Sequence, residues 1–268
     1  YFNNMIQNYS FKNKTVFISG ATHGIGLQCL TDFAKMGANV ITFSRDLKKI
    51  KSTKNKLFNS KGNHLIERGD ILDKNFAHSF SKKVLKRYKS VDILVHNVGG
   101  GGRWGKEDIL KSPDDVWQDV YDKNNKGLIM FNKHFLPGMI KKKWGRVIAI
   151  ASVNGFEVKE VDRPWFNGAK AAQLAIIKSL SKKKKYTKSN ITFNSISPGP
   201  ILIKDTGWYD EKIKNPKKFK KFVETQIFTK KIGTPKDISP MCIFLASELT
   251  AYINGCNIVI DGGVSQKI

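Results

Sequence analysis

The sequence predicts an α/β fold that is doubly wound: one parallel sheet of seven strands with helices on both faces. Seven apolar runs alternate with segments long enough to be helices, in a repeated β-α-β order. Several of these runs are almost continuous in Val and Ile, which is typical of parallel strands buried on both faces. With 268 residues and neither an internal repeat nor a Ser/Gly-rich linker, the chain is expected to form one domain over residues 1–268.

Each predicted strand is one of the short apolar runs. The strands are expected at 15–20, 39–44, 64–70, 91–97, 145–152, 191–197 and 257–263. The helices are expected between them, at about 24–37, 46–60, 73–90, 113–141, 166–188 and 235–250. Pro113 suits the first turn of its helix, and Ser112 before it is expected to be the N-cap.

The segment from about 200 to 232 departs from this regular order. It is long and rich in Lys, and Gly207 and Pro216 interrupt it. These properties suit a substrate lid over a binding site.

The net charge of +25, from 47 Lys and Arg against 22 Asp and Glu, raises nucleic acid as a partner. Only 6 of the 47 are Arg, however, and the lysines occur in runs such as 141–143, 182–185 and 217–221. Sites that recognise nucleic-acid bases or bind phosphate groups favour Arg, because its planar guanidinium can form two hydrogen bonds at once. The lysine runs are therefore interpreted as solvated faces, and nucleic acid is not expected as a partner.

The chain also lacks the patterns of membrane and metal proteins. No apolar run approaches the ~20 residues of a membrane span. The three cysteines, Cys29, Cys242 and Cys256, lie far apart, and no His/Cys/Glu group has metal-ligand spacing. The expectation is a cytoplasmic protein with reduced thiols, no membrane partner and no metal.

A glycine-rich stretch, SGATHGIG at 19–26, follows the first predicted strand and opens the first predicted helix. Gly20, Gly24 and Gly26 allow a tight turn that aims backbone N–H groups and a helix N-terminus at a diphosphate. In this position the motif predicts a dinucleotide-binding loop rather than a purely structural turn.

Further motifs follow in order: HNVG at 96–99, NNKG at 124–127, a fifth strand that ends in Ser152, Lys170, SPGPI at 197–201 and NGCNIVIDGG at 254–263. With these motifs the chain resembles the classical short-chain dehydrogenase/reductase family from about residue 12 to 264. The resemblance implies a Rossmann-type fold, a nicotinamide cofactor and hydride transfer between a ketone and a secondary alcohol.

The resemblance also implies which residues contact the cofactor. The glycine loop contributes Gly20, Thr22, His23, Gly24, Ile25 and Gly26. The other expected contacts are Asp70 and Ile71 for adenine, Asn97 and Gly99 for ribose, Pro198, Gly199 and Ile201 for nicotinamide, and Lys170 for the nicotinamide ribose.

The end of the second strand predicts a preference for NADP(H) over NAD(H). Enzymes that prefer NAD usually place an acidic residue there for the ribose hydroxyls, whereas this chain has Ser44 followed by Arg45. A guanidinium can bind a 2′-phosphate with two hydrogen bonds, and His23 could add to this site. The alternative is that Arg45 is only a surface residue at a strand end.

The catalytic motif is incomplete. The resemblance assigns Asn124, Ser152 and Lys170 to catalytic positions, but Phe166 stands where the family has its proton-transferring Tyr. Losing a positioned acid or base typically lowers a rate by ~10²–10⁴. Three interpretations stay open. The first is another proton source, namely Lys170, Ser152, a bound water, or a residue of the lid or of 157–162. The others are a natural non-catalytic member that binds cofactor or ligand, and a Phe166 introduced to silence the enzyme. Of the candidate substitutes Tyr121, Tyr186 and Tyr209, Tyr209 in the expected lid is the best placed, although a lid residue that packs on substrate or protein is the more common case.

The substrate side is predicted from GGGGRWG at 99–105, which follows the fourth strand. Arg103 and Trp104 offer a cation and a flat apolar surface, and Arg163 could face the same cleft. These residues suggest a small-molecule substrate that is anionic or attached to an acyl carrier, although a solvated surface loop is an equal alternative. The family is commonly dimeric or tetrameric, so a homo-oligomer through helices 113–141 and 166–188 is expected.

Overall fold

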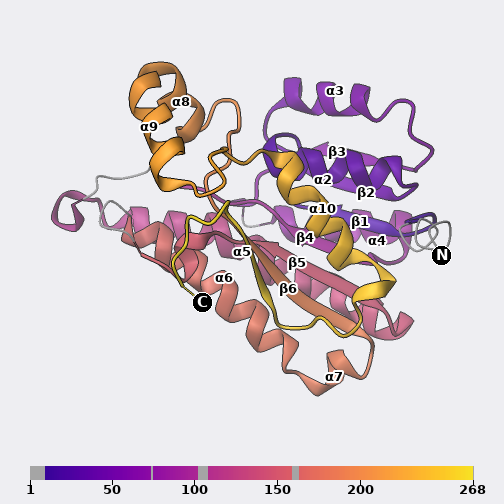
Figure 1. Ribbon diagram of the computed structural model, residues 1–268. Coiled ribbons are helices and arrows are strands. Elements are labelled where there is room, and N and C mark those ends of the chain that lie inside the picture. Colours follow the sequence, from indigo (N-terminus) through magenta and orange to yellow (C-terminus); the bar gives the residue numbers. More distant parts are fainter. Residues whose placement is uncertain (1–9, 74, 102–107, 159–162, 268) are drawn as a thin grey trace.

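The computed structural model describes residues 10–73, 75–101, 108–158 and 163–267. These residues form the predicted seven-stranded sheet, in the order β3-β2-β1-β4-β5-β6-β7 (Figure 1). The strands are β1 (Thr15–Ile18), β2 (Asn39–Ser44), β3 (Leu65–Arg68), β4 (Ile93–His96), β5 (Gly145–Ile150), β6 (Ile191–Pro198) and β7 (Asn257–Ile260). Every neighbouring pair is parallel, so the predicted fold class is confirmed.

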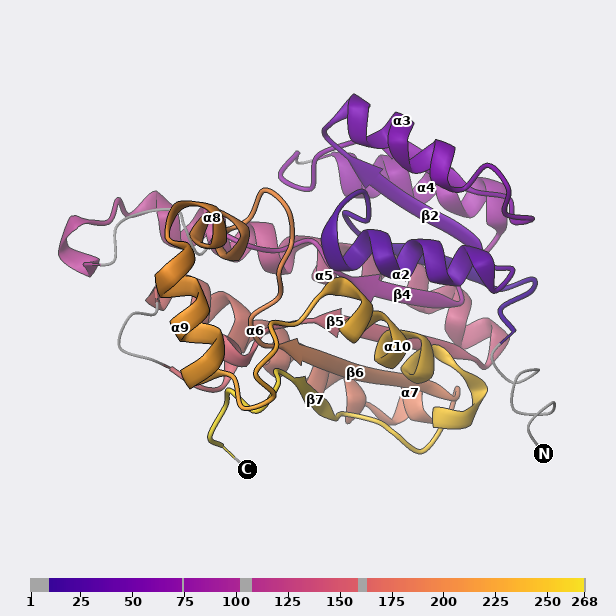
Figure 2. The ribbon, with the colours of Figure 1, turned by 45° about the horizontal axis from the view of Figure 1, so that its top comes forward.

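Helices cover both faces of the sheet. They are α2 (Gly24–Lys35), α3 (Leu47–Lys56), α4 (Phe76–Tyr88), α5 (Asp115–Lys142), α6 (Pro164–Ser181), α7 (Lys184–Thr187), α8 (Gly207–Lys214), α9 (Pro216–Gln226) and α10 (Pro235–Ala246). Figure 2 shows α2 and α10 in front of the sheet and α4 and α5 behind it. Within the described ranges, no helix combines the length and the apolar character needed to cross a membrane.

Strand β1 shows why the apolar runs are continuous. Val16 and Ile18 are fully buried against α2, in a cluster that includes Phe33. Phe17 points to the opposite face, where its ring centre lies 4.5 Å from that of Phe131 on α5. Because successive side chains of a strand alternate between faces, a sheet covered on both sides needs an apolar residue at every position.

The strand order reverses between β1 and β4. The chain builds β2 and β3 on one side of β1, then returns to place β4 on the other side. The loops that leave β1 and β4 therefore diverge and open a crevice at the carboxyl ends of the strands. Ligands bind at this position in open α/β sheets.

Several predicted helix ends differ from the structure; the helix expected at 46–60, for example, ends at Lys56. Three of the differences have a local cause. The helix expected from 113 begins at Asp115, and Ser112 is not its N-cap; the Ser112 hydroxyl instead donates to the Asp108 carbonyl. The helix expected over 166–188 is split into α6 and α7, because the chain turns at Lys182 and packs the Tyr186 ring 5.2 Å from that of Phe193.

The third difference is at the last helix. Helix α10 ends at Ala246, and the expected continuation to 250 is a short 3₁₀ turn, η3 (Glu248–Thr250). The Ser247 hydroxyl lies between the two, donating to the Phe244 carbonyl and accepting from the Leu249 N–H. A side chain that bonds the backbone at both ends of a turn competes with continued helix.

The segment expected to be a lid is largely helical. Gly207 is the first residue of α8 and Pro216 the first of α9, so both residues mark helix starts. Proline suits the first helical turn because its missing N–H would have no helical partner there. The Trp208 and Phe222 rings stack 4.4 Å apart and join the two helices, which lie together at one end of the sheet (Figures 1 and 2).

Candidate active site

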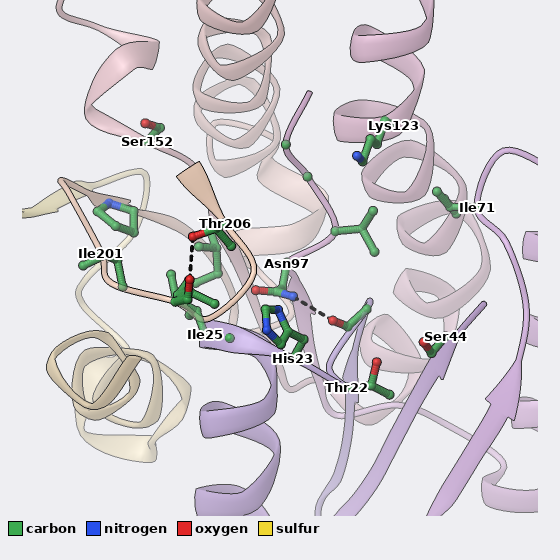
Figure 3. A pocket seen from close by; sticks show the side chains of 18 of the residues that line it. Thr22, His23, Ile25, Ser44, Ile71, Asn97, Lys123, Ser152, Ile201 and Thr206 are labelled. Carbon is green, nitrogen blue, oxygen red and sulfur yellow. Dashed lines mark hydrogen bonds between the residues drawn. The ribbon is translucent and has the colours of Figure 1, made fainter. Parts of the chain in front are cut away.

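A cavity of about 530 Å³ opens at the carboxyl ends of β1 to β6. Among the predicted site residues, those that line it are Gly20, Thr22, His23, Gly24, Ile25, Arg45, Asp70, Ile71, Asn97, Gly99, Ser152, Phe166, Lys170, Pro198, Gly199 and Ile201. Figure 3 shows Ile71, Ser44 and Lys123 at one end, Ser152 and Ile201 at the other, and Thr22, His23 and Asn97 between them. The fold thus brings these residues to one place from six strand ends.

The glycine loop has the backbone that an anion site needs. Gly20 and Gly24 have φ of +64° and +56°, in the left-handed region that favours glycine. Helix α2 starts at Gly24, and the His23 side chain at its N-cap makes no capping hydrogen bond. The first N–H groups of α2 therefore keep the capacity to bind a diphosphate.

Gly26 does not line the cavity and has a different use. A Cβ on Gly26 would lie 2.3 Å from Asn97 Nδ2. Asn97 uses this space to donate from Nδ2 to the Ser19 and Gly20 carbonyls, at 3.0 and 3.2 Å. Gly26 therefore allows the loop after β4 to hold the loop after β1 in position.

His23 is a poor cation in this environment. Burial is the main cause that lowers its pKa, and the nearby Lys49 lowers it further, while Asp205 opposes the change. A neutral imidazole adds little to phosphate binding, so the predicted help from His23 is weakened unless a bound anion reverses the shift.

The ends of β2 and β3 carry an ion pair. Arg45 Nη1 lies 3.6 Å from Asp70 Oδ2, while Asp70 Oδ1 accepts from the Leu72 N–H at 3.0 Å. Lys123 on α5 also lines the cavity, and sequence reasoning missed it. Its pKa is lowered by burial first and then by Arg45, with Asp70 opposing. The only feature of the sequence that could have indicated Lys123 as a site residue is its position next to Asn124.

Ser152 caps the turn η2 (Val153–Gly155) that follows β5. Its Oγ accepts from the Asn154 N–H at 3.2 Å and faces Asn154 Oδ1 at 3.4 Å. The Asn154 amide in turn donates to Asn167 Oδ1 on α6 at 3.3 Å. Amides and hydroxyls of this kind can orient a substrate oxygen, but none of them is an acid at neutral pH.

Phe166 and Lys170 lie one helical turn apart on α6, and both line the cavity. Lys170 Nζ is 5.8 Å from the centre of the Phe166 ring. The amine donates to the Ile150 carbonyl at 3.1 Å and to Gln173 Oε1 at 2.9 Å. Burial lowers the pKa of Lys170 to about 7.

Asn124 contacts the loop after β4 rather than the cavity itself. Its Oδ1 accepts from the Gly100 N–H at 3.2 Å, and its Nδ2 donates to the Gly100 carbonyl at 2.8 Å. This two-point contact fixes the loop after β4 to α5. The Asn124 backbone carbonyl accepts from Gln173 Nε2 at 2.8 Å.

The other predicted residues lie elsewhere. Arg163 is the N-cap of α6 and Tyr209 is in α8, and neither lines the cavity; its lining includes Trp208 instead. Tyr121 and Tyr186 are also absent from the lining. Arg103 and Trp104 lie outside the described residues.

The described part of the chain contains no group of His, Cys, Asp or Glu that could hold a metal. The ionisable side chains that line the cavity there are His23, Arg45, Asp70, Lys123 and Lys170. Most of these side chains are basic, which suits the binding of anions. Any acid–base chemistry in the cavity depends on these few groups.

Comparison with known proteins gives consistent matches over nearly the full chain. The sequence model of the family described as Enoyl-(Acyl carrier protein) reductase matches residues 20–265. A 3-oxoacyl-[acyl-carrier-protein] reductase of Aquifex aeolicus is 28% identical over 255 residues, covering 94% of this chain and 98% of that protein. Dehydrogenase/reductase SDR family member 4 of Mus musculus is 28% identical over 260 residues, covering 96% and 88%.

Solved structures show the same fold. A 3-oxoacyl (acyl-carrier-protein) reductase from Agrobacterium tumefaciens with NADP bound superposes with a TM-score of 0.87 at 23% identity, covering 98% of this chain and 99% of that one. L-Sorbose reductase from Gluconobacter frateurii, complexed with NADPH and L-sorbose, has a TM-score of 0.87 at 24% identity, covering 97% and 100%.

Proposed function

This chain belongs to the short-chain dehydrogenase/reductase family, and from that premise we propose that it is an oxidoreductase acting on a ketone or secondary alcohol with NADP(H). The observation that carries the proposal is that Ser152 and Lys170 line the same cavity as the glycine loop. When bound, the nicotinamide would supply or accept the hydride. The residues of this chain would position both reactants and exchange the substrate's proton.

The residues present fit a dinucleotide. The loop at Gly20, Gly24 and the uncapped start of α2 would hold the diphosphate. Ile71 and Asp70 would border the adenine, and Asn97 and Gly99 the ribose. Pro198, Gly199 and Ile201 would border the nicotinamide, with Lys170 on its ribose.

The preference for NADP(H) over NAD(H) rests on Arg45. Its guanidinium lines the cavity and is 67% exposed, so it can turn from Asp70 toward a 2′-phosphate. Ser44 leaves room there and brings no competing negative charge. Two structures with this fold hold NADP or NADPH, which supports the same choice.

The alternative is a catalytically impaired or non-catalytic member that binds cofactor or ligand. Phe166 favours it, because no Tyr lines the cavity in the described residues. The substitution could be natural or engineered. Lys170 is compatible with both functions, since holding a ribose needs no proton transfer.

For the substrate we propose a small molecule, anionic or attached to an acyl carrier. Two matched relatives are named as acyl-carrier-protein reductases, and cations such as Lys123 line the cavity. Arg103, Trp104, Arg163 and Tyr209 stay candidates for substrate contact. Helices α8 and α9 would form the lid of this single domain, because Trp208 reaches the cavity from α8.

Assembly into a homodimer or homotetramer would use α5 and α6. An apolar groove of about 340 Å³ runs between these helices and is lined by residues such as Ile129, Leu136 and Ile176. Cys29, Cys242 and Cys256 are free thiols, which supports a cytoplasmic location.

The test is turnover of NADPH and NADH against a panel of neutral, anionic and thioester carbonyl compounds. The proposal predicts NADPH-dependent reduction by the Phe166 protein or by Phe166→Tyr. If both proteins bind NADPH and neither reduces any carbonyl, the non-catalytic alternative replaces it.

A further inference from the structure

Lys170 is an almost completely buried amine that faces the cavity. The residue is 4% exposed, and its two hydrogen-bond acceptors are both neutral carbonyl oxygens, those of Ile150 and Gln173. A Cβ built on Gly99 would lie 2.9 Å from Nζ, so the amine lies directly against the loop after β4. No carboxylate pairs with this lysine in the described part of the chain, and a buried lysine without such a partner is unusual and points to a functional role.

Gln173 joins Lys170 to α5. Its Oε1 accepts from Lys170 Nζ at 2.9 Å, and its Nε2 donates to the Asn124 carbonyl at 2.8 Å. The Gln173 side chain is fully buried, within a run of apolar residues on α6. Both ends of the amide are thus used, which fixes its orientation and therefore the position of the amine.

The two acceptors leave one tetrahedral position on Nζ. If Ile150 and Gln173 each take one N–H, that position holds a third N–H when Lys170 is charged and a lone pair when it is neutral. The same two hydrogen bonds serve both states. Gain or loss of a proton therefore needs no rearrangement of the protein.

We propose that Lys170 is the proton-exchanging residue of this site, in place of the hydroxyl that Phe166 lacks, and that Gln173 is its positioning residue. The inference rests on the proposed oxidoreductase function. It assigns a proton source to the end of the cavity that contains Ser152. The hydroxyl and amide groups present there are not acids at neutral pH.

The surroundings of Lys170 allow this exchange near neutral pH. Burial is the cause that lowers its pKa, to about 7. Within the described residues, the other ionisable side chains that line the cavity with Lys170 are His23, Arg45, Asp70 and Lys123, and Glu157 follows η2 in the chain. Glu157 accepts from the Gln266 N–H, toward the C-terminal segment.

In carbonyl reduction the substrate carbon accepts a hydride, and the C=O π pair moves onto oxygen. That oxygen takes a proton from the Lys170 ammonium, directly or through one hydroxyl group. Lys170 becomes neutral and then regains a proton from solvent. Alcohol oxidation is the reverse, with neutral Lys170 as the base.

The first experiment measures the protonation of Lys170 without any turnover. NMR of protein labelled at the lysine side chains is recorded against pH, and Lys170→Arg identifies the signal. We expect one lysine to titrate about three units below the ordinary lysine pKa. Gln173→Glu should raise its midpoint and Gln173→Leu should lower it, each by about one unit.

Gln173→Glu and Gln173→Leu form a matched pair. Once the introduced carboxyl group is ionised, both variants lack the donor to the Asn124 carbonyl, so the loss of that hydrogen bond is common to them and their effects on the amine can be compared. Opposite shifts support a direct contact with Lys170. Shifts in the same direction, or a Lys170 that titrates with the surface lysines, would overturn the inference.

The second experiment follows carbonyl reduction from pH 5 to 10 in the same proteins. Because reduction needs the ammonium, kcat/KM should fall as pH rises through the Lys170 midpoint. Its inflection should move with the NMR midpoint in both Gln173 variants. Lys170→Arg keeps a positive charge but cannot release a proton, so turnover at saturating NADPH should fall ~10²–10⁴-fold.

Phe166→Tyr distinguishes failure of the inference about Lys170 from failure of the proposed oxidoreductase function. If only this variant turns over, the oxidoreductase function stands and Lys170 is not the proton source. If neither it nor the Phe166 protein reduces any carbonyl, the oxidoreductase function itself fails, and this inference with it.

Discussion

Arg45 Nη1 lies 3.6 Å from Asp70 Oδ2, so the cation after β2 is paired with the carboxylate after β3 at the mouth of the cavity. Both side chains are substantially exposed, at 67% and 38%. Exposed ion pairs of this kind contribute only ~0–1 kcal/mol. The pair therefore positions the guanidinium without preventing its use by a ligand.

Replacing Arg45 should change the choice of cofactor. In Arg45→Ser we expect the Kd for NADPH to rise ~10–100-fold, because a charge-assisted contact to the 2′-phosphate is lost. The Kd for NADH should change little. Fluorescence titration measures both, and Arg68→Ser, at the exposed end of β3, is the matched control. An equal loss for the two cofactors would reject Arg45 as the selecting residue.

Restoring the hydroxyl at position 166 should raise activity. Phe166→Tyr keeps the ring, which already lines the cavity, and adds an acid beside Lys170. We expect kcat/KM for carbonyl reduction to rise by ~10²-fold or more where proton transfer limits the rate. Phe58→Tyr adds the same hydroxyl at an exposed site and should have no effect. Unchanged activity in Phe166→Tyr would show that the missing hydroxyl is not the limitation.

Two glycines should respond in opposite ways to the same change. Gly26→Ala places a Cβ 2.3 Å from Asn97 Nδ2, and we expect a loss of ~1–3 kcal/mol in unfolding free energy together with weaker NADPH binding. Gly168 on α6 has nothing within 4 Å of its Cβ position, so Gly168→Ala should add ~0.5–1 kcal/mol. Urea denaturation measures both. A neutral Gly26→Ala would show that the two loops can separate freely.

His96 at the end of β4 should make the fold sensitive to acid. Burial lowers its pKa to about 3 from the ordinary 6.5, so between these values the unfolded chain binds the proton and the folded chain does not. Stability should therefore fall as pH decreases through this window, by up to ~1.4 kcal/mol per pH unit. The slope for His96→Asn, measured by urea denaturation, should be smaller. Equal slopes would assign the acid sensitivity to other groups.

Trp208 tests the lid. Trp208→Ala removes an aromatic surface that α8 presents to the cavity and its stacking on Phe222. We expect KM for the carbonyl substrate to rise ~10-fold while the Kd for NADPH stays within about 2-fold. Phe228→Ala, an exposed aromatic beyond α9, is the control. Steady-state kinetics and binding titration separate the two effects, and a loss confined to NADPH binding would argue against a substrate lid.

The fold and much of the candidate site could be predicted from the amino-acid sequence. Continuous Val/Ile runs, alternating with helix-length segments, leave a parallel sheet as the structure that buries them on both faces. The glycine loop, Arg45 and Ser152 each lie at or just after the end of a predicted strand, so their meeting at one sheet edge was predictable. The ends of the helices were less predictable. Ser112 and Lys182 show that local hydrogen bonds and the packing of Tyr186 determine where helices begin and end.

The pairing of side chains, in contrast, depends on the packing of whole elements. No spacing in the sequence connects Gln173 with the Asn124 carbonyl, which lies 49 residues earlier in the chain, or places Lys123 in the cavity. The same holds for Trp208, which reaches the cavity although the sequence favoured Tyr209. Such contacts depend on which faces of α5, α6 and α8 turn inward, and helix packing sets those faces. The lowered pKa of Lys170 has the same origin, since the groups against its amine come from Ile150, Gln173 and the loop at Gly99.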